Sequence, residues 1–160
     1  MTVGEERARR AEATDLRRIA ELAEMGIEEL SQTKGGDVWA RREARARPVE
    51  RSIAAALASH DHEVVVGTLD HTVMGYGIIR LERLRDQGIL GVVEDIYVEP
   101  LARGIGIGEA MMDHLLAWCR ERGCFGVDSL ALPGNRATKN FFERFGLVAR
   151  AIVVHKRLDG

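Results

Sequence analysis

The chain has 160 residues, of which 46% are hydrophobic and 30% charged, so it is long enough to fold as one globular domain with its own core. Its net charge of −2 excludes the strongly basic surface on which nucleic-acid binding depends. No apolar run approaches the about 18 residues of a membrane span. We therefore expect neither nucleic acid nor a membrane among its partners.

Hydrophobic periodicity predicts a helical region in the first third of the chain. Thr14 is positioned to cap the first long helix, whose apolar residues recur on one face until Ser31. Pro48 suits the first turn of a later helix. In chain order we expect a strand at residues 5–12 and helices from Thr14 to near Ser31, around Trp39, and from Pro48 to just before His60.

After His60 the pattern changes to that of strands. Turns at Asp70-His71 and Asp86-Gln87-Gly88 separate three consecutive strands, which therefore form an antiparallel meander. We expect strands at residues 62–69, 72–84 and 89–98, a helix at 109–122 ended by Gly123, a strand at 125–132, a helix closed by Gly146, and a last strand at 147–158. This order predicts the α/β fold class, as a single domain with a mixed sheet.

A glycine-rich turn stands between the third meander strand and the helix after it. The strand ends at Val98, a break covers residues 99–102, and Arg103-Gly104-Ile105-Gly106-Ile107-Gly108 follows directly before the helix. A turn of this kind places free backbone N–H groups at a helix N-terminus, where the helix dipole favours anions. We expect it to hold the pyrophosphate of a nucleotide-like cofactor.

The spacing of the glycines narrows the choice of cofactor. A dinucleotide fold needs GxGxxG, but the sixth position is Glu109 when counted from Gly104 and Met111 when counted from Gly106. A P-loop needs Gly-Lys followed by Ser or Thr, and the sequence contains no such triplet. NAD and ATP are therefore disfavoured.

Two segments resemble those of a known family. Arg103-x-x-Gly106-x-Gly108, preceded by Glu94-Asp95-Ile96-Tyr97-Val98-Glu99-Pro100, resembles the acyl-CoA-binding signature of the GNAT superfamily of N-acyltransferases. Residues 135–147, which begin 27 residues beyond Gly108, resemble that family's N-x-x-A-x-x-F-Y-x-x-x-G-F segment. The resemblance implies one GNAT-like domain over residues 1–160, with a mixed, mostly antiparallel central sheet flanked by helices.

The resemblance also implies acetyl-CoA as the acyl donor. Its pyrophosphate would lie on the backbone N–H groups of residues 103–108, and its pantetheine arm would pair with the backbone at Ile96 and Val98 like an added strand. A backbone N–H near Val98 would polarise the thioester carbonyl. Lys139 would either meet a cofactor phosphate or remain a solvated helix charge. The candidate cofactor-binding residues are Ile96, Tyr97, Val98, Arg103, Gly104, Ile105, Gly106, Ile107, Gly108, Asn135, Lys139 and Phe142.

Transfer of an acyl group to an amine needs a base, because a primary amine with a pKa near about 10 is mostly protonated. Glu94 is the first candidate and Asp95 the second. As neighbours in a strand they should point to opposite faces, and Glu94 should share the face of Ile96 and Val98 unless a bulge intervenes. The alternative for both carboxylates is a purely structural pairing with arginine.

Phe142 departs from the family pattern, which has at this position the tyrosine that protonates the leaving thiolate. Phenylalanine has no proton to donate. Tyr97 and Tyr76 are alternative acids, and a thiol with a pKa near roughly 8.5 is a fair leaving group unaided. We therefore expect an N-acetyltransferase acting on a primary amine of a small molecule or protein. The alternative is a CoA-binding regulatory module with little or no turnover.

The sequence does not identify the amine acceptor. The resemblance implies that it enters over Gln32–Arg47, where Trp39 and several arginines suit an aromatic or acidic acceptor but are also typical of a solvated helix. A homodimer is compatible with the family. The cysteines bear on location, because Cys119 and Cys124 form neither a CxxC motif nor a disulfide framework. Both should be buried, and the expected location is the cytoplasm. No residue spacing suggests a metal site.

Overall fold

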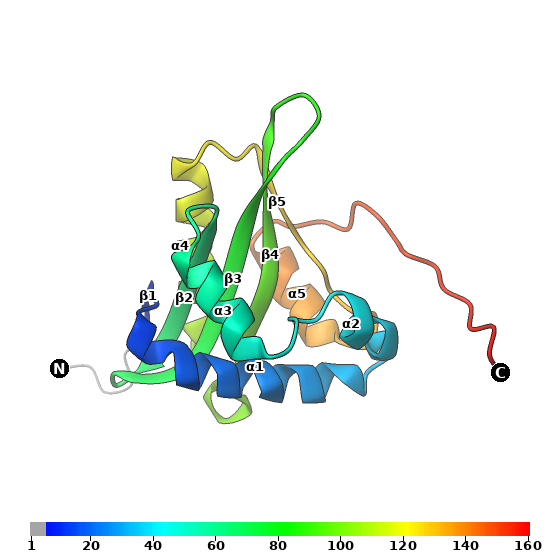
Figure 1. Cartoon of the computed structure of the whole chain (residues 1–160), viewed down its shortest axis with the longest axis horizontal. Coiled ribbons are helices and arrows are strands. Elements are labelled where there is room, and N and C mark those ends of the chain that lie inside the picture. The colour runs from blue at the N-terminus through cyan, green and yellow to red at the C-terminus, as the bar shows by residue number, and fades with distance from the viewer. Residues whose placement is uncertain (1–5) are drawn as a thin grey trace.

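The computed structural model describes residues 6–160 and contains one five-stranded sheet with helices on both faces (Figure 1). The strands are β1 (Glu6–Arg10), β2 (His62–Leu69), β3 (Thr72–Arg83), β4 (Ile89–Val98) and β5 (Gly126–Ser129). The helices are α1 (Leu16–Ser31), α2 (Gly36–Arg42), α3 (Val49–Ala58), α4 (Ile107–Glu121) and α5 (Arg136–Arg144), with short 3-10 turns η1 (Ala13–Asp15) and η2 (Pro100–Ala102).

The sheet order is the order of the strands in the chain. β1 to β4 are antiparallel neighbours, and β5 joins β4 in parallel. The predicted mixed, mostly antiparallel sheet is therefore confirmed, meander included. A parallel pair needs a crossover, and α4 provides it between β4 and β5.

Two apolar clusters hold the helices against the sheet. α1 and α3 cover one face, where Ile19, Leu22 and Ile53 are fully buried against Val64 and Val66 of β2. α4 covers the other face, and Val65 points into its cluster. β2 is thus buried on both faces, which explains its continuous run of valines. We refer to these as the α1 face and the α4 face.

Glycines in the strands allow α4 to approach the sheet closely. A Cβ atom at Gly67 of β2 would lie 2.4 Å from Cγ2 of Ile107, and one at Gly75 of β3 would lie 3.1 Å from Met111. A larger side chain at either position would push the first turns of α4 away from the sheet. The N-terminus of α4 is therefore seated firmly beside the end of β4.

Several predicted boundaries are wrong. Thr14 does not cap α1: it lies in η1, and the Asp15 carboxylate accepts hydrogen bonds from the Glu12 N–H at 2.8 Å and from Arg9. α4 begins at Ile107 and not at residue 109, and β5 covers only Gly126–Ser129 of the predicted 125–132. The strand predicted over residues 5–12 is confirmed as β1, but it ends at Arg10, and residue 5 lies outside the described part.

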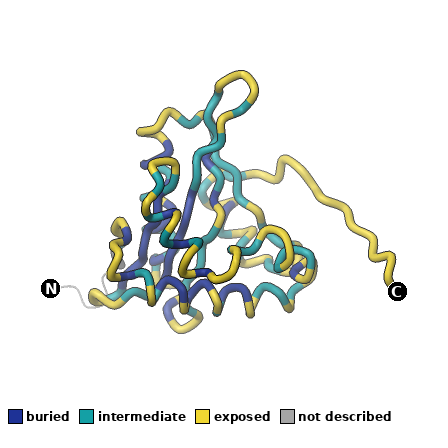
Figure 2. Tube along the Cα trace, viewed as in Figure 1, coloured by how far each residue is buried: buried dark blue, intermediate teal, exposed yellow. Residues whose placement is uncertain are grey.

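The prediction of a last strand at residues 147–158 is also wrong. This segment forms no helix or strand, and it is exposed throughout residues 148–160 (Figure 2). Its sequence has the pattern of a strand, but a strand forms only beside another strand, and here the segment leaves the body of the molecule after α5 (Figure 1). We call residues 148–160 the C-terminal arm.

Neither cysteine forms a disulfide. Cys119 is buried as predicted, whereas Cys124 is only partly buried. Burial, helped by the neighbouring Cys124, raises the pKa of the Cys119 thiol to about 12. Among residues 6–160, no helix is both long enough and apolar enough to cross a membrane.

Candidate active site

β4 and β5 part from each other halfway along β4. Their parallel pairing covers only Leu90 to Val93 of β4 and ends where Val93 lies beside Ser129. Beyond this point the sheet has no strand next to β4, although β4 itself continues to Val98. The last five residues of β4 therefore present one backbone edge that no strand of residues 6–160 covers.

Backbone N–H and C=O groups alternate in direction along a strand, and this alternation determines which residues of β4 direct theirs toward the open edge. The Glu99 N–H donates to Met74 O at 2.8 Å, so the backbone groups of Glu99 point toward β3. Successive residues of a strand direct their backbone groups to opposite sides. The N–H and C=O groups of Val98 and Ile96 thus point away from β3, into the gap. These are the two residues predicted to pair with an extended pantetheine arm. The Val98 carbonyl already accepts from Nε of Arg103 at 2.8 Å, and no strand pairs with the other groups.

The glycine turn, residues 103–108, lies at the end of this open edge. Gly104 and Gly106 have φ angles of 81° and 96°, in the left-handed region that glycine adopts without strain. Gly106 caps α4, and the first backbone bond of the helix is donated by the Ala110 N–H to Gly106 O. Within the described chain, the backbone N–H groups from Gly104 to Glu109 have no backbone acceptor. They form the predicted anion-binding nest.

Arg103 joins the turn to α1. Its Nε donates to Val98 O at 2.8 Å, and its two terminal nitrogens bind the Glu29 carboxylate at 2.9 and 2.7 Å. These hydrogen bonds raise the pKa of Arg103 and lower that of Glu29. The guanidinium also stacks 5.2 Å from the ring of Tyr97. The sequence assigned Arg103 to the donor site, but it contained no signal for its partner Glu29, which lies 74 positions earlier.

The second resemblance segment forms α5, which packs against the first turn of α4. A Cβ atom at Gly108 would lie 3.1 Å from the ring of Phe141, so a side chain there would crowd this aromatic ring. Phe142, 5% exposed, packs edge-on against Phe141 with ring centroids 5.6 Å apart. The packing role expected of Phe142 is therefore present in the α4-face cluster.

Asn135 and Lys139 both make contacts within α5. The Asn135 side chain caps the helix by accepting from the Thr138 N–H at 3.2 Å. Lys139 is largely exposed and pairs with Glu143 one turn later at 3.2 Å. Both interactions lie within α5 and its cap, so neither of them requires a bound cofactor. The roles of these two residues toward a cofactor therefore remain predictions.

A β-bulge changes the predicted orientation of Glu94. Ile78 of β3 lies opposite Asp95 whereas Ile79 lies opposite Val93, so Glu94 is the extra residue of β4. It does not share a face with Ile96 and Val98, which belong to the α4-face cluster. The expectation that Glu94 and Asp95 point to opposite faces is wrong, because the bulge brings both carboxylates to Arg45.

Arg45, between α2 and α3, holds the two carboxylates together. Its side chain is 8% exposed and binds Asp95 at 2.6 Å and Glu94 at 2.8 Å. Burial would lower the pKa of Arg45, but its bonds to Asp95 and Glu94 outweigh this, so the pKa is raised. Arg80 binds the other oxygen of Glu94 at 3.1 Å. We call Arg45, Glu94, Asp95 and Arg80 the carboxylate cluster.

The two carboxylates differ in their freedom to accept a proton. Both Asp95 oxygens accept hydrogen bonds, one of them from the Tyr76 hydroxyl at 2.7 Å, and its side chain is only 10% exposed. Glu94 is 26% exposed, and Nε2 of His62 lies 3.8 Å from its Oε1. Glu94 is thus the more accessible of the two, and His62, the first residue of β2, lies beside it.

The tyrosines considered as acids are engaged elsewhere. Tyr76 is buried, and burial together with the Asp95 charge raises its pKa well above the usual value. Its hydroxyl proton is directed at Asp95. Tyr97 lies on the α1 face, where burial and the charge of Glu29 raise its pKa. Neither environment favours donation to a thiolate, because the pKa of each tyrosine is raised and the Tyr76 proton is already held by Asp95.

Comparison with known proteins identifies the family. A model of the acetyltransferase (GNAT) family matches residues 24–147, which is most of the chain. The chain belongs to this family. The matched part contains both the glycine turn and α5, so the GNAT resemblance of these two segments is confirmed.

Individual relatives agree with the GNAT assignment. Glucosamine 6-phosphate N-acetyltransferase 1 of Oryza sativa subsp. japonica is 33% identical over 61% of this chain and 59% of its own length. The structure of glucosamine-6-phosphate N-acetyltransferase from Arabidopsis thaliana has a TM-score of 0.68 at 22% identity, covering 97% of this chain and 99% of that one. Aminoglycoside N-acetyltransferase AAC(6')-Iy in complex with CoA has a TM-score of 0.75 at 15% identity, covering 99% and 98%. The chain spans little more than half the length of the first curated relatives it matches.

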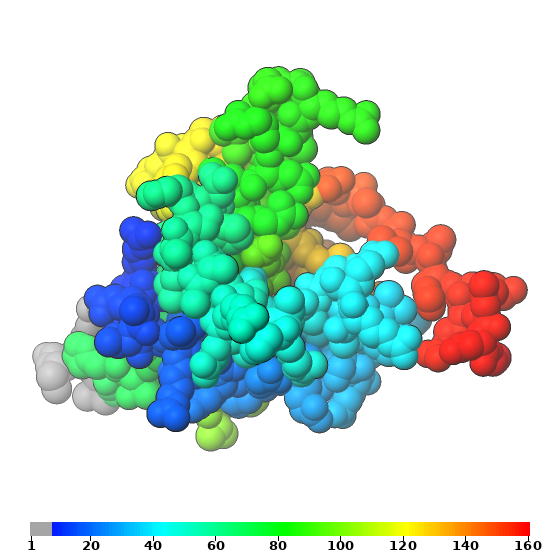
Figure 3. Space-filling model, viewed as in Figure 1, coloured from blue at the N-terminus to red at the C-terminus, as the bar shows by residue number. Residues whose placement is uncertain are grey.

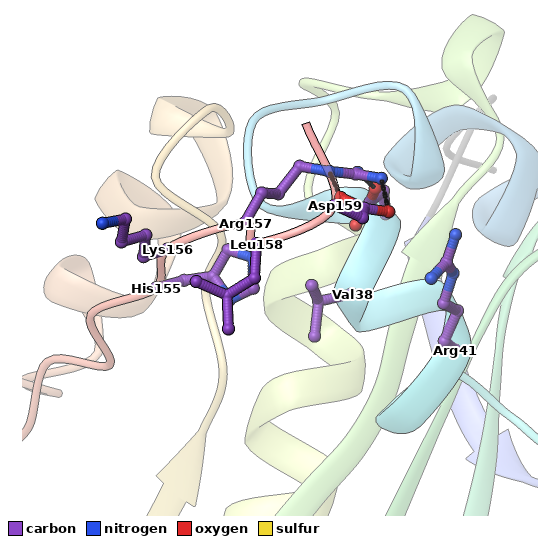
Figure 4. A pocket seen from close by; sticks show the side chains of 8 residues that line it. Val38, Arg41, His155, Lys156, Arg157, Leu158 and Asp159 are labelled. Carbon is purple, nitrogen blue, oxygen red and sulfur yellow. Dashed lines mark hydrogen bonds and ion pairs between the residues drawn. The ribbon is translucent and has the colours of Figure 1, made fainter.

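A hollow of about 330 Å³ lies apart from the glycine turn, between α2 and the end of the C-terminal arm (Figure 4). Val38 and Arg41 of α2 line one side, and residues 155–159 line the other. Arg157 crosses it to bind Asp37 at 2.6 Å. This is the region of α2 over which the acceptor is expected to enter. Residues 6–160 contain no group of three or more His, Cys, Asp or Glu side chains arranged to hold a metal ion.

Proposed function

We propose that this protein transfers an acetyl group from acetyl-CoA to a primary amine by direct attack of the amine nitrogen on the thioester. The observation that carries the proposal is the continuous backbone surface formed by the open edge of β4 and the glycine turn. It offers strand-like pairing at Ile96 and Val98, and then free N–H groups from Gly104 onward. Family membership over residues 24–147 supports the same reading.

The donor fits this surface group by group. The pyrophosphate carries negative charge, and the N-terminus of α4 offers backbone donors and the positive end of a helix dipole. The pantetheine arm carries amide groups, which match the N–H and C=O groups of Ile96 and the N–H group of Val98, whereas the Val98 carbonyl is held by Arg103. In the gap between β4 and β5, a backbone N–H near Val98 would then stabilise the oxyanion that forms from the thioester carbonyl.

The acceptor amine must lose a proton to become a nucleophile. We assign this proton to Glu94, directly or through one water molecule, because Glu94 is the more exposed carboxylate of the cluster. The nitrogen forms a bond to the carbonyl carbon and releases its second proton to solvent, the carbon–sulfur bond breaks, and CoA leaves as a thiolate. With Phe142 in place of a tyrosine, the thiolate takes its proton from solvent, which its modest basicity permits.

Arg45 and Arg80 keep Glu94 oriented in this scheme. Arg45 also balances the charge of Asp95, so that the two adjacent carboxylates do not repel each other in a partly buried site. Asp95, which is held by both Arg45 and Tyr76, is assigned a positioning role. Of the two candidate bases, it is therefore the second choice.

The acceptor is proposed only as a class. Relatives with the names glucosamine 6-phosphate N-acetyltransferase and aminoglycoside N-acetyltransferase support amino sugars as the first compounds to test. The acceptor would reach the gap past α2 and the linker that holds Arg45. The cytoplasmic location remains a prediction from cysteine usage.

Thiol release in the presence of acetyl-CoA and a panel of amines tests the proposal. Amino sugars, polyamines, arylalkylamines and a lysine-containing peptide should be included, with binding of acetyl-CoA measured by calorimetry in parallel. Thiol release that depends on an amine supports acetyl transfer. Binding without release for every acceptor favours the regulatory alternative. Absence of acetyl-CoA binding contradicts both.

A further inference from the structure

His62 begins β2 on the same face of the sheet as the carboxylate cluster. Side chains of a strand alternate between its two faces, and Val64 and Val66 of β2 belong to the α1-face cluster, so His62 shares that face. In the register of the sheet, His62 lies opposite Arg80 of β3. Arg80 in turn binds Glu94 of β4, so His62, Arg80 and Glu94 form one row of side chains across three neighbouring strands.

Ser59, at the C-cap of α3, holds the imidazole ring of His62. Oγ of Ser59 lies 2.9 Å from Nδ1 of His62 and also accepts a hydrogen bond from the Asp61 N–H at 3.1 Å. A hydroxyl oxygen can accept two hydrogen bonds, so this geometry suits the tautomer in which Nδ1 carries the ring proton and donates it to Ser59. Nε2 then has a free lone pair, and it is Nε2 that lies 3.8 Å from Oε1 of Glu94.

Glu94 is poorly placed to keep a proton that it takes from an amine. Its Oε1 accepts from Arg45 at 2.8 Å, and its Oε2 is bound by Arg80 at 3.1 Å. Both contacts are charge-assisted, and a neutral carboxylic acid would weaken both. Asp95 does not provide an alternative acceptor, because both of its oxygens already accept hydrogen bonds. The proton must therefore move on to another group before the next turnover.

His62 is the neighbour of Glu94 that can take up this proton. Among residues 6–160, the ion pairs of Glu94 involve Arg45, Arg80 and His62, and an arginine is already protonated. The His62 side chain is 26% exposed, and the segment from α3 to β2 lies at the surface beside the β3–β4 hairpin (Figure 3). A single water molecule or a small rotation of either side chain bridges the 3.8 Å between Nε2 and Oε1.

We propose that His62 receives the amine proton from Glu94 and passes it to solvent, with Ser59 holding the ring in position. The inference rests on the proposed function, because acetyl transfer is what delivers the proton to Glu94. In this step the O–H bond of protonated Glu94 breaks and an Nε2–H bond forms on His62, which becomes an imidazolium while Glu94 regains its charge. The imidazolium then gives the proton to water and returns to its neutral form. His62 acts only through Glu94 and needs no contact with the acceptor.

Amine-dependent thiol release tests this relay. His62→Ala should lower kcat roughly 10-fold, less than the loss of Glu94 itself because water partly replaces the ring, with little change in KM for acetyl-CoA. Imidazole added to the assay should restore part of the rate, because it can enter the vacated space and accept the proton. His60→Ala is the control: His60 is exposed two residues earlier, and this variant should keep its rate and not respond to imidazole. An unchanged kcat in His62→Ala, or a loss that imidazole does not restore, overturns the proposal.

Nitrogen-15 spectra of the histidine rings test the geometry independently of turnover. The His62 signals are assigned by their loss in His62→Ala, whose circular dichroism should match that of the natural chain. At a pH where the ring is neutral, Nδ1 should carry the proton and Nε2 should be bare, and Ser59→Ala should mix the two tautomers. A natural chain with the proton on Nε2 overturns the proposal.

The two experiments together separate the relay from the proposed function. Absence of thiol release with every amine contradicts the acetyl transfer and the relay alike. Thiol release that does not depend on His62 contradicts the relay alone.

Discussion

The open edge of β4 and its α1 face are built from different kinds of interaction. The backbone edge at Ile96 and Val98 lies in the plane of the sheet and continues into the glycine turn, and it depends on main-chain geometry. The α1 face carries Asp95 and, through the bulge, Glu94, and there the polar contacts depend on side chains from other elements, namely Arg45, Arg80 and Tyr76. The first region binds the donor in our account, whereas the second prepares the acceptor.

In our account, donor binding and activation of the acceptor amine are assigned to these two different regions. Backbone donors at a helix N-terminus recognise phosphate whatever side chains surround them. A base, in contrast, must be kept ionised, oriented and accessible, and that requires specific side chains around it. Substitutions in the two regions should therefore have separable effects on donor binding and on turnover.

Gly106→Val should have the largest effect on the donor region. Gly106 has a φ angle of 96°, which a β-branched residue does not tolerate, and it caps α4 where the nest begins. Binding of acetyl-CoA, measured by calorimetry, should be lost. Gly123→Val is the matched control, because Gly123 also has a positive φ of 75° but lies at the other end of α4. Equal loss of binding in both variants would contradict a local role for the turn.

Arg45→Ala should most strongly affect the stability of the acceptor region. Removing the buried guanidinium leaves two carboxylates without their main partner, which typically costs about 3–5 kcal/mol in the free energy of unfolding. Urea unfolding measures this change. Arg47→Ala is the control, since Arg47 pairs with Glu24 at the exposed surface. A variant lacking Arg45 that unfolds at the same urea concentration as the natural chain would contradict the cluster's structural importance.

Glu94→Gln should separate turnover from donor binding. Loss of a general base typically lowers the rate by roughly 100-fold or more, so kcat should fall by at least this factor and the acid limb of the pH–rate profile should flatten. Acetyl-CoA affinity should survive. Glu82→Gln is the control, because Glu82 also pairs with Arg80, at 3.0 Å, but lies outside the cluster. An unchanged kcat in the Glu94 variant would remove Glu94 from the mechanism.

Lys139→Ala should have the smallest effect. Lys139 is 61% exposed and already pairs with Glu143, and surface pairs of this kind contribute little. The dissociation constant of acetyl-CoA should change by less than about threefold, since a factor of three corresponds to well under 1 kcal/mol. A loss of tenfold or more would instead establish a direct contact between Lys139 and a cofactor phosphate.

The donor region could be predicted from the sequence because its determinants are local. The glycines at positions 104 and 106 act through their own backbone and through the turn in which they lie. The apolar periodicity of β2 to β4 similarly determines the meander. The boundaries of α1 and α4 were less predictable, because the Asp15 contacts and the left-handed conformation of Gly106 compete with simple capping rules.

The carboxylate cluster could not be predicted from local pattern. Arg45 lies 50 positions before Asp95, and among several arginines of the same segment nothing in the sequence distinguishes it. The bulge at Glu94 also leaves no residue signature, yet it reverses the side to which that carboxylate points. The prediction of a last strand was wrong for a related reason. Residues 147–158 have the composition of a strand, but whether a strand forms there depends on a neighbouring edge.

Amide hydrogen exchange with and without acetyl-CoA tests the central claim most directly. If the donor lies along the open edge of β4 and on the glycine turn, the amides of Ile96 and Val98 and those of residues 104–109 should exchange more slowly when acetyl-CoA is present. The amides of β1 and β2, which lie far from the gap in the sheet order, should not change. Slower exchange elsewhere without protection at these two segments would contradict the proposed donor site.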